Sequence, residues 1–222
     1  MSAGKFRGLN LAQHVGDEPA AVESNRRRLV SACRLPSTPI WMNQIHGTTI
    51  IDAGEIANTK LISADGAYAG EPNLVLAILS ADCLPIVVCD DLGQELALIH
   101  AGWKGLFRGI VESAIGKFQA PPARLLAWIG PGISQHAYIV DDQFRQRFID
   151  FDSQLKCSFF PDGAHWRADL YKIAEHLLNR CGVIQVSRYG GCTFNDVERF
   201  YSYRRDGSTG RMATIGWLSP SP

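Results

Sequence analysis

The stretch 73–118 constrains the fold of this chain more than any other. Two apolar runs, 74–79 and 96–99, each end close to a reactive side chain: Cys83 follows the first run and His100 the second. Rigid elements commonly present functional side chains at their ends. We therefore expect two buried strands to carry a thiol and an imidazole into one site.

The charge balance excludes two classes of partner. The chain has 222 residues, with 22 basic and 22 acidic side chains and a formal net charge of zero. Proteins that bind nucleic acid or anionic membranes usually carry a positive surface, and this balance gives no sign of one. We expect no nucleic-acid partner and no membrane partner.

Cellular location is predicted from the N-terminus and the cysteines. The first residues lack an apolar core typical of a signal peptide, and Ser80, Asp82 and Pro85 interrupt the longest apolar region. None of the six cysteines forms a CxxC pair. Reduced thiols in the cytoplasm are the expectation.

Hydrophobic periodicity predicts a mixture of helices and strands over the whole chain. Predicted helices lie at 19–34, 107–118, 141–150 and 169–181. Predicted strands lie at 40–45, 48–52, 74–80, 85–89, 95–100, 125–129, 183–186 and 212–218, with a loop at 53–73. The strands are too dense for alternating βαβ units, so the expected fold class is α+β, in a single domain over residues 1–222.

Three residues form a candidate metal site: His46, Cys83 and His100. Each lies at or just beyond the end of an apolar run, and Gly47 and Gly102 follow the two histidines closely. Imidazole and thiolate ligands suit zinc or copper. Three protein ligands leave a fourth position open, as in catalytic zinc sites, where zinc can activate water at neutral pH.

The same residues allow two other interpretations. Cys83 could act as a nucleophile with His100 as its base, and Asp82 or another carboxylate could orient the imidazole. A structural metal site would need a fourth protein ligand, for which His136 and His165 are available. Sequence spacing does not separate these alternatives.

Several motifs resemble one known family. The segments NQIHGTTI, SADCLPIVVCD, LIHAGWKGLFRGIVESAI, AWIGPGI and FYSYRRDGSTGRMA are similar to laccase-domain, or polyphenol-oxidase-like, proteins. That family includes proteins described as peptidoglycan editing factors and as purine nucleoside phosphorylases. The resemblance covers nearly the whole chain. It implies a metal site of His46, Cys83 and His100, and a layered α/β/β/α sandwich with mixed sheets, similar to cytotoxin deamidases.

The resemblance also implies an activity. It is phosphorolysis of adenosine, inosine, guanosine and 5′-methylthioadenosine, together with hydrolytic deamination of adenosine to inosine. Zn²⁺ is the expected cofactor and Cu²⁺ the second candidate. The alternative function is a Cys–His hydrolase or amidase that edits UDP-MurNAc precursors carrying L-Ser. We expect purine nucleosides and phosphate as partners, and a monomer or weak homodimer.

Other polar residues in these motifs are candidates for substrate contact. Lys104, Arg204 and Arg205 could bind phosphate, although the family often has Arg in place of Lys104, and lysine lacks a bidentate grip on anions. Asp82 could act as a base or have a structural role. Gln44 could orient substrate or pair with backbone.

The histidine content argues against true laccase activity. A multicopper oxidase needs a blue-copper centre and a three-copper cluster, built from many histidines in HxH pairs. This chain has six histidines and no HxH pair. One His–Cys–His site cannot carry out the four-electron reduction of dioxygen, so we expect no laccase activity.

Overall fold

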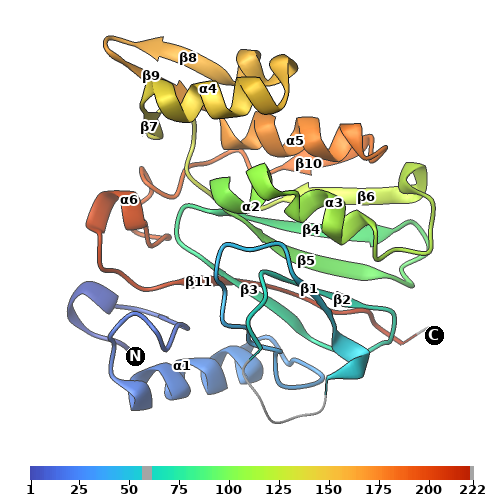
Figure 1. The fold of residues 1–222 in the computed structure, drawn as a ribbon. Coiled ribbons are helices and arrows are strands. Elements are labelled where there is room, and N and C mark those ends of the chain that lie inside the picture. The colour runs from blue at the N-terminus through green and yellow to red at the C-terminus, as the bar shows by residue number, and fades with distance from the viewer. Residues whose placement is uncertain (57–61, 221–222) are drawn as a thin grey trace.

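A mixed six-stranded sheet lies at the centre of the fold (Figure 1). The computed structural model describes residues 1–56 and 62–220. Two outer strand pairs are parallel and the inner pairs are antiparallel. In spatial order the strands are β1 (Ile50–Asp52), β2 (Gly66–Ala69), β5 (Leu96–Ala101), β4 (Leu84–Asp90), β6 (Leu125–Ile129) and β10 (Gln185–Arg188).

A second, two-stranded sheet covers one face of the central sheet. β3 (Leu76–Ser80) pairs antiparallel with β11 (Met212–Gly216). Leu76 and Ile78 of β3 pack in one apolar cluster with Leu96 and Leu98 of β5. Helix α1 (Pro19–Ala32) lies outside this sheet, where its Leu29 packs near Leu79 and Ala213.

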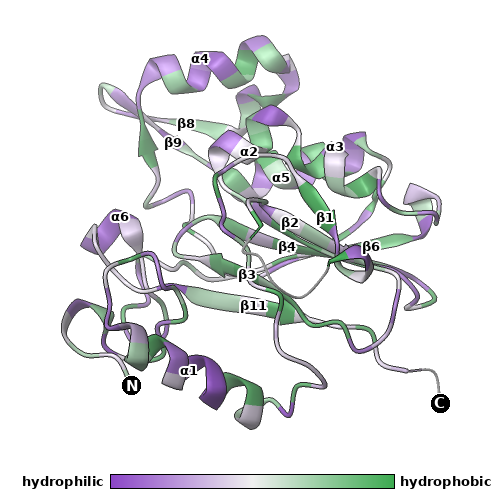
Figure 2. Cartoon of the chain, turned by 60° about the horizontal axis from the view of Figure 1, so that its bottom comes forward, coloured by the Kyte–Doolittle hydropathy of each residue, from purple (hydrophilic) through white to green (hydrophobic). Residues whose placement is uncertain are grey.

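Helices α2 (Trp103–Arg108), α3 (Ile110–Ile115) and α5 (Leu170–Arg180) cover the opposite face of the central sheet. The largest apolar cluster lies between these helices and the sheet, and includes Ile86, Ile99, Ile110 and Ile173. Helix, sheet, sheet and helix therefore form successive layers, which confirms the predicted α+β sandwich. Figure 2 shows hydrophobic residues concentrated in the strands and hydrophilic residues over much of α1 and α4.

A third sheet and several short helices complete the chain. The three-stranded sheet has the order β7 (Ile139–Val140), β9 (His165–Ala168) and β8 (Phe159–Asp162), and it packs with α4 (Asp142–Phe151). The short helices are α6 (Tyr203–Asp206), η1 (Gly4–Phe6), η2 (Ala53–Glu55), η3 (Pro122–Arg124) and η4 (Ser153–Ser158). Within the described residues, no helix combines the length and hydropathy needed to cross a bilayer.

Two predictions about the first half of the chain were wrong. The segment 40–45 makes only isolated bridges, at Ile40 and Asn43. The segment 53–73, predicted as a loop, contains the buried strand β2, while its residues 57–61 lie outside the described residues. The first residue of this strand, Gly66, has to be glycine because a Cβ there would lie 2.5 Å from a methyl carbon of Ile50. The glycine permits close strand packing; it does not mark a turn.

The predicted helix at 107–118 is divided into α2 and α3. Gly109 lies between the two helices with a φ of 92°, in the left-handed region that favours glycine. The apolar stripe is unaffected, since Leu106, Ile110 and Val111 are all buried against the sheet.

Candidate metal centre

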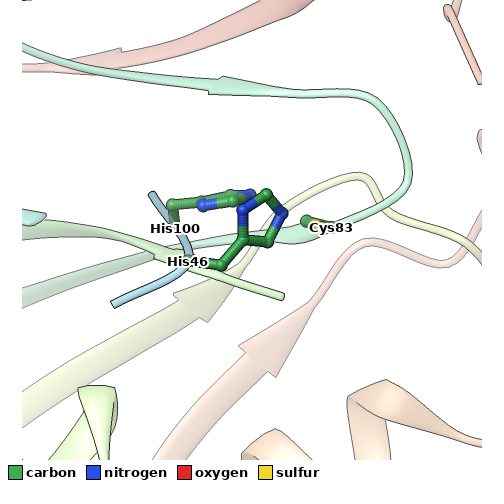
Figure 3. A group of neighbouring side chains, drawn as sticks. All are labelled: His46, Cys83 and His100. Carbon is green, nitrogen blue, oxygen red and sulfur yellow. The ribbon is translucent and has the colours of Figure 1, made fainter. Parts of the chain in front are cut away.

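His46, Cys83 and His100 converge at one end of the central sheet. Their candidate ligand atoms all lie within 4.8 Å of one another. Figure 3 shows the three side chains grouped together, and the two imidazole rings meet edge to face with their centroids 4.8 Å apart. The structure thus brings together the three residues that the sequence singled out.

Pairing of β4 with β5 aligns two of the ligands. Leu84 lies opposite Ala101 and Pro85 opposite His100, so Cys83 lies beside Gly102. A Cβ at Gly102 would lie 2.9 Å from the Cys83 sulfur. Only glycine leaves room for the thiol at this position.

The buried carboxylate of Asp65 binds both the loop that carries His46 and the ring of His100. It accepts hydrogen bonds from the backbone N–H groups of Ile45, His46 and Gly47 at 3.1, 2.9 and 2.6 Å. Three converging amides stabilise the tight loop in which His46 adopts a left-handed φ of 58°. The same carboxylate lies 2.9 Å from Nδ1 of His100.

This contact determines which nitrogen of His100 faces the centre. With Nδ1–H donating to Asp65, Nε2 is left for a metal or for the Cys83 thiol. Asp65 was not predicted as a site residue, because it lies in the segment predicted as a loop. An aspartate directly before a buried strand was the available signal.

The centre favours a thiolate beside an imidazolium when no metal is bound. Burial alone would raise the pKa of Cys83, but His100 and His46 offset this effect and lower the pKa to about 6. Burial alone would lower the pKa of His100, whereas the Cys83 thiolate and Asp65 raise it to about 9. The thiolate is also the form that binds metals.

The donor set fits zinc. Thiolate and imidazole are the common zinc ligands, and a carboxylate hydrogen-bonded to the outer nitrogen of a ligating histidine is a typical supporting contact. Within residues 1–56 and 62–220, these three residues form the one group of three or more His, Cys, Asp or Glu side chains suited to a metal. Neither His136 nor His165 belongs to it, and among the described residues no other His, Cys, Asp or Glu joins the three.

A cavity of about 400 Å³ adjoins the three candidate ligands. It is lined by His14, Gln44, His46, Leu79, Ser80, Ala81, Cys83, His100, Tyr203 and Arg211. The side chain of Gln44 bonds at both ends to the backbone of Leu79, at 2.8 Å in each direction. Gln44 thus pairs with the backbone of β3 while also lining the cavity.

Asp82 lies behind the cavity wall and does not line it. Its buried carboxylate accepts hydrogen bonds from the hydroxyls of Thr193 and Ser202 at 2.6 and 3.0 Å, and from the backbone N–H of Arg204 at 2.6 Å. These bonds attach the segment that carries Tyr203 to the residue preceding Cys83. In this position Asp82 anchors the wall of the pocket.

The three predicted anion-binding cations also lie outside the cavity lining. Lys104 is exposed. The Arg204 guanidinium lies over the ring of Tyr138 and donates to the Ile139 carbonyl at 2.8 Å. Arg205 pairs with Asp206 and donates to nearby backbone carbonyls.

Four polar residues of the lining were not predicted from the sequence: His14, Ser80, Tyr203 and Arg211. Tyr203 and Arg211 both belong to the FYSYRRDGSTGRMA motif, in which Arg204 and Arg205 were the predicted anion-binding residues. The motif was the correct signal. Which of its side chains faces the cavity depends on α6 and on the pairing of β11.

Comparison with known proteins identifies the family. A family model described as "Multi-copper polyphenol oxidoreductase laccase" matches residues 1–219. The chain belongs to this family.

Its relatives carry a more specific name. A protein of Escherichia coli named purine nucleoside phosphorylase YfiH is 41% identical over 214 residues, which cover 96% of this chain and 87% of that protein. A Pseudomonas aeruginosa protein, also named a purine nucleoside phosphorylase, is 39% identical over 98% of this chain and 89% of its own length. A crystal structure of a Neisseria meningitidis protein has a TM-score of 0.94 at 37% identity, over 99% of this chain and 90% of the other.

Proposed function

We propose that this protein is a zinc-dependent purine nucleoside enzyme. Its reactions would be phosphorolysis of adenosine, inosine, guanosine and 5′-methylthioadenosine, and deamination of adenosine to inosine. The observation that carries the proposal is a three-ligand His–Cys–His centre whose open side adjoins a cavity of about 400 Å³. Pockets for small molecules typically measure about 300–1,000 Å³. The names of the relatives supply the substrate class.

Zinc, with copper as the second candidate metal, would supply the Lewis acidity that activates water for attack on C6 of adenine. In phosphorolysis a phosphate oxygen forms a bond to C1′ of the ribose. The bond from C1′ to N9 breaks, and the base leaves with its electron pair and takes up a proton. The products are the free base and ribose 1-phosphate, or 5-methylthioribose 1-phosphate when the substrate is 5′-methylthioadenosine, and no oxidant is required.

The side chains of the pocket have complementary tasks in this proposal. His46, Cys83 and His100 would hold the metal, and Asp65 orients His100 through its Nδ1. Tyr203 lines the cavity with 61% of its surface exposed, and the Arg211 guanidinium lies over its ring, 5.8 Å from the centroid; the exposed part of the ring would stack against a purine. We further propose that the protein is a monomer or a weak homodimer and that it is located in the cytoplasm.

The test is a product assay on purified, zinc-loaded protein. It is incubated with adenosine and phosphate, with and without a chelator, and ribose 1-phosphate, adenine and inosine are measured. Zinc-dependent formation of these products is expected. If the zinc-loaded protein forms none of them, the proposal is rejected.

A second candidate function has its own structural support. Asp65, His100 and Cys83 lie in contact in the order orienting carboxylate, base and nucleophile. This arrangement of three side chains suits a Cys–His hydrolase or amidase that acts on UDP-MurNAc precursors containing L-Ser. Turnover of such a precursor by metal-free protein, with a covalent adduct at Cys83, would support it. Loss of all turnover on metal removal would argue against it.

A further inference from the structure

The pairing of β3 with β11 brings a cation and a hydroxyl into the cavity. Met212 lies opposite Ser80 in this ladder, so Arg211 lies just beyond it, near Ala81 and the turn that leads to Cys83. Ser80 and Arg211 both line the cavity that adjoins the metal ligands. Among the described residues of that lining, Arg211 is the one Lys or Arg.

Asp82 is close enough to act electrostatically on Arg211, but no described carboxylate forms an ion pair with it. Within the part of the chain that the structure describes, Arg211 forms no salt bridge. One of its terminal nitrogens donates to the carbonyls of Thr209 and Gly210 at 2.8 and 2.9 Å, which fixes the guanidinium in its own turn. The remaining N–H groups are left for a ligand. Arg205, by contrast, is paired with Asp206.

Ser80 contributes a second, independent feature. Its side chain is buried, with 3% of the residue exposed, yet the structure shows no hydrogen bond of its hydroxyl to any described residue. The Ser80 oxygen is not among the fully enclosed polar atoms that lack a partner, so it is accessible from the cavity that the residue lines. A hydroxyl left without a protein partner at the wall of a cavity is suited to contact a ligand.

We propose that Arg211 and Ser80 form an anion subsite that binds the phosphate substrate. A guanidinium presents a planar set of N–H donors that matches two phosphate oxygens, and a serine hydroxyl can donate to a third. The subsite lies in the same cavity as the metal ligands, where phosphate can approach the ribose. The identity of this anion as a co-substrate depends on the proposed function; the subsite itself rests on the geometry.

The experiment compares Arg211→Gln, Arg211→Lys and Ser80→Ala in the full-length, zinc-loaded protein. Arg147→Gln is the control, because Arg147 is exposed on α4 and its loss changes the net charge by the same amount. The KM for phosphate in inosine phosphorolysis is expected to rise about 30-fold or more in Arg211→Gln. It should rise less in Arg211→Lys and by about fivefold in Ser80→Ala. Arg147→Gln should not change it.

Adenosine deamination provides an internal comparison, because it uses water in place of phosphate. The ratio of phosphorolysis to deamination should fall at least about tenfold in Arg211→Gln. Zinc content and the melting temperature of each variant identify losses caused by misfolding. A KM for phosphate in Arg211→Gln equal to that of the unmodified protein would overturn the subsite.

A second measurement separates failure of the subsite from failure of the proposed function. Inorganic phosphate should raise the melting temperature of the unmodified protein and of Arg147→Gln, but not that of Arg211→Gln. This result would support the subsite even if no ribose 1-phosphate forms, which would count against the proposed function alone. Equal stabilisation of all three proteins, or of none, would overturn the subsite.

Discussion

Asp65 and Asp82 are two buried aspartates that support opposite sides of one cavity. Asp65 binds the loop containing His46 and the ring of His100, both of which are candidate metal ligands. Asp82 binds Thr193, Ser202 and Arg204, which lie in the segment that forms the far wall. Both carboxylates accept at least three hydrogen bonds, yet only Asp65 touches a ligand side chain.

This difference indicates that the orientation of the candidate metal ligands and the shape of the pocket depend on separate hydrogen-bond networks. Asp65 determines where the ligand nitrogens point. Asp82 determines where Tyr203 lies, since it accepts the N–H of the next residue. Substitutions at the two aspartates should therefore affect metal binding and substrate binding separately.

The largest effect is expected for Asp65→Asn. The amide would direct N–H groups at backbone donors, so the unfolding free energy should fall by about 2–4 kcal/mol. Loss of a carboxylate that orients a ligand should weaken zinc binding about 10- to 100-fold. Urea unfolding of metal-free protein and a competition titration with a chromogenic chelator measure the two effects. Unchanged zinc affinity would show that Asp65 does not orient His100.

Asp82→Asn is the matched variant on the other side of the cavity. Asparagine tolerates the φ of 90° at this position, so the backbone should be retained. Weaker bonds to the wall should lower the unfolding free energy by about 1–3 kcal/mol and raise the KM for nucleoside. Zinc affinity should fall less than in Asp65→Asn. A larger loss of zinc affinity here would invert the comparison.

The pH dependence of Cys83 alkylation tests the electrostatics of the metal-free centre. The thiolate is the reactive form, so its alkylation should be retained above the lowered pKa of about 6 and lost as pH falls through that value. The pKa of an ordinary cysteine is about 8.5. Iodoacetamide labelling with peptide mass spectrometry gives the midpoint, and the exposed Cys33 serves as an internal reference.

The two aspartate variants should separate in this measurement as well. In Asp65→Asn the midpoint for Cys83 should rise, because the imidazolium of His100 loses a stabilising carboxylate. In Asp82→Asn it should stay near that of the unmodified protein. A midpoint near 8.5 in the unmodified protein would contradict the thiolate–imidazolium pair.

The smallest effect is expected for Thr193→Val. This nearly isosteric change removes one of the donors to Asp82, a hydroxyl at 2.6 Å, and leaves two others in place. The unfolding free energy should fall by about 1 kcal/mol, measured by urea unfolding. A loss as large as that of Asp82→Asn would mean that the threonine alone carries the anchor.

Local patterns predicted much of the fold. The strand at 125–129 and the helix near 169–181 were correct because a continuous apolar run and a 3.6-residue stripe determine them directly. The sheet of β7, β8 and β9 was missed because its strands are only two to four residues long, and because β7 pairs with β9 across α4 and η4. Such short segments carry too few residues to show a period.

In the candidate site, too, some residues could be predicted from local motifs and others could not. His46, Cys83 and His100 were found because each lies in a recognisable motif at the end of an apolar run. Asp65 was missed because its function depends on three backbone N–H groups presented by a distant loop. Arg211 was missed because only the register of β11 against β3 shows which arginine faces the cavity.

That same register has a consequence for biosynthesis. Among the described strands, β11 is the one ladder partner of β3, although the two lie far apart in the sequence. A nascent chain emerging from the ribosome therefore presents β3 as an apolar strand with an open edge until residues 212–216 have also emerged. Open strand edges invite aggregation during synthesis. Chaperone demand should accordingly peak late in translation of this chain, just before the pocket closes.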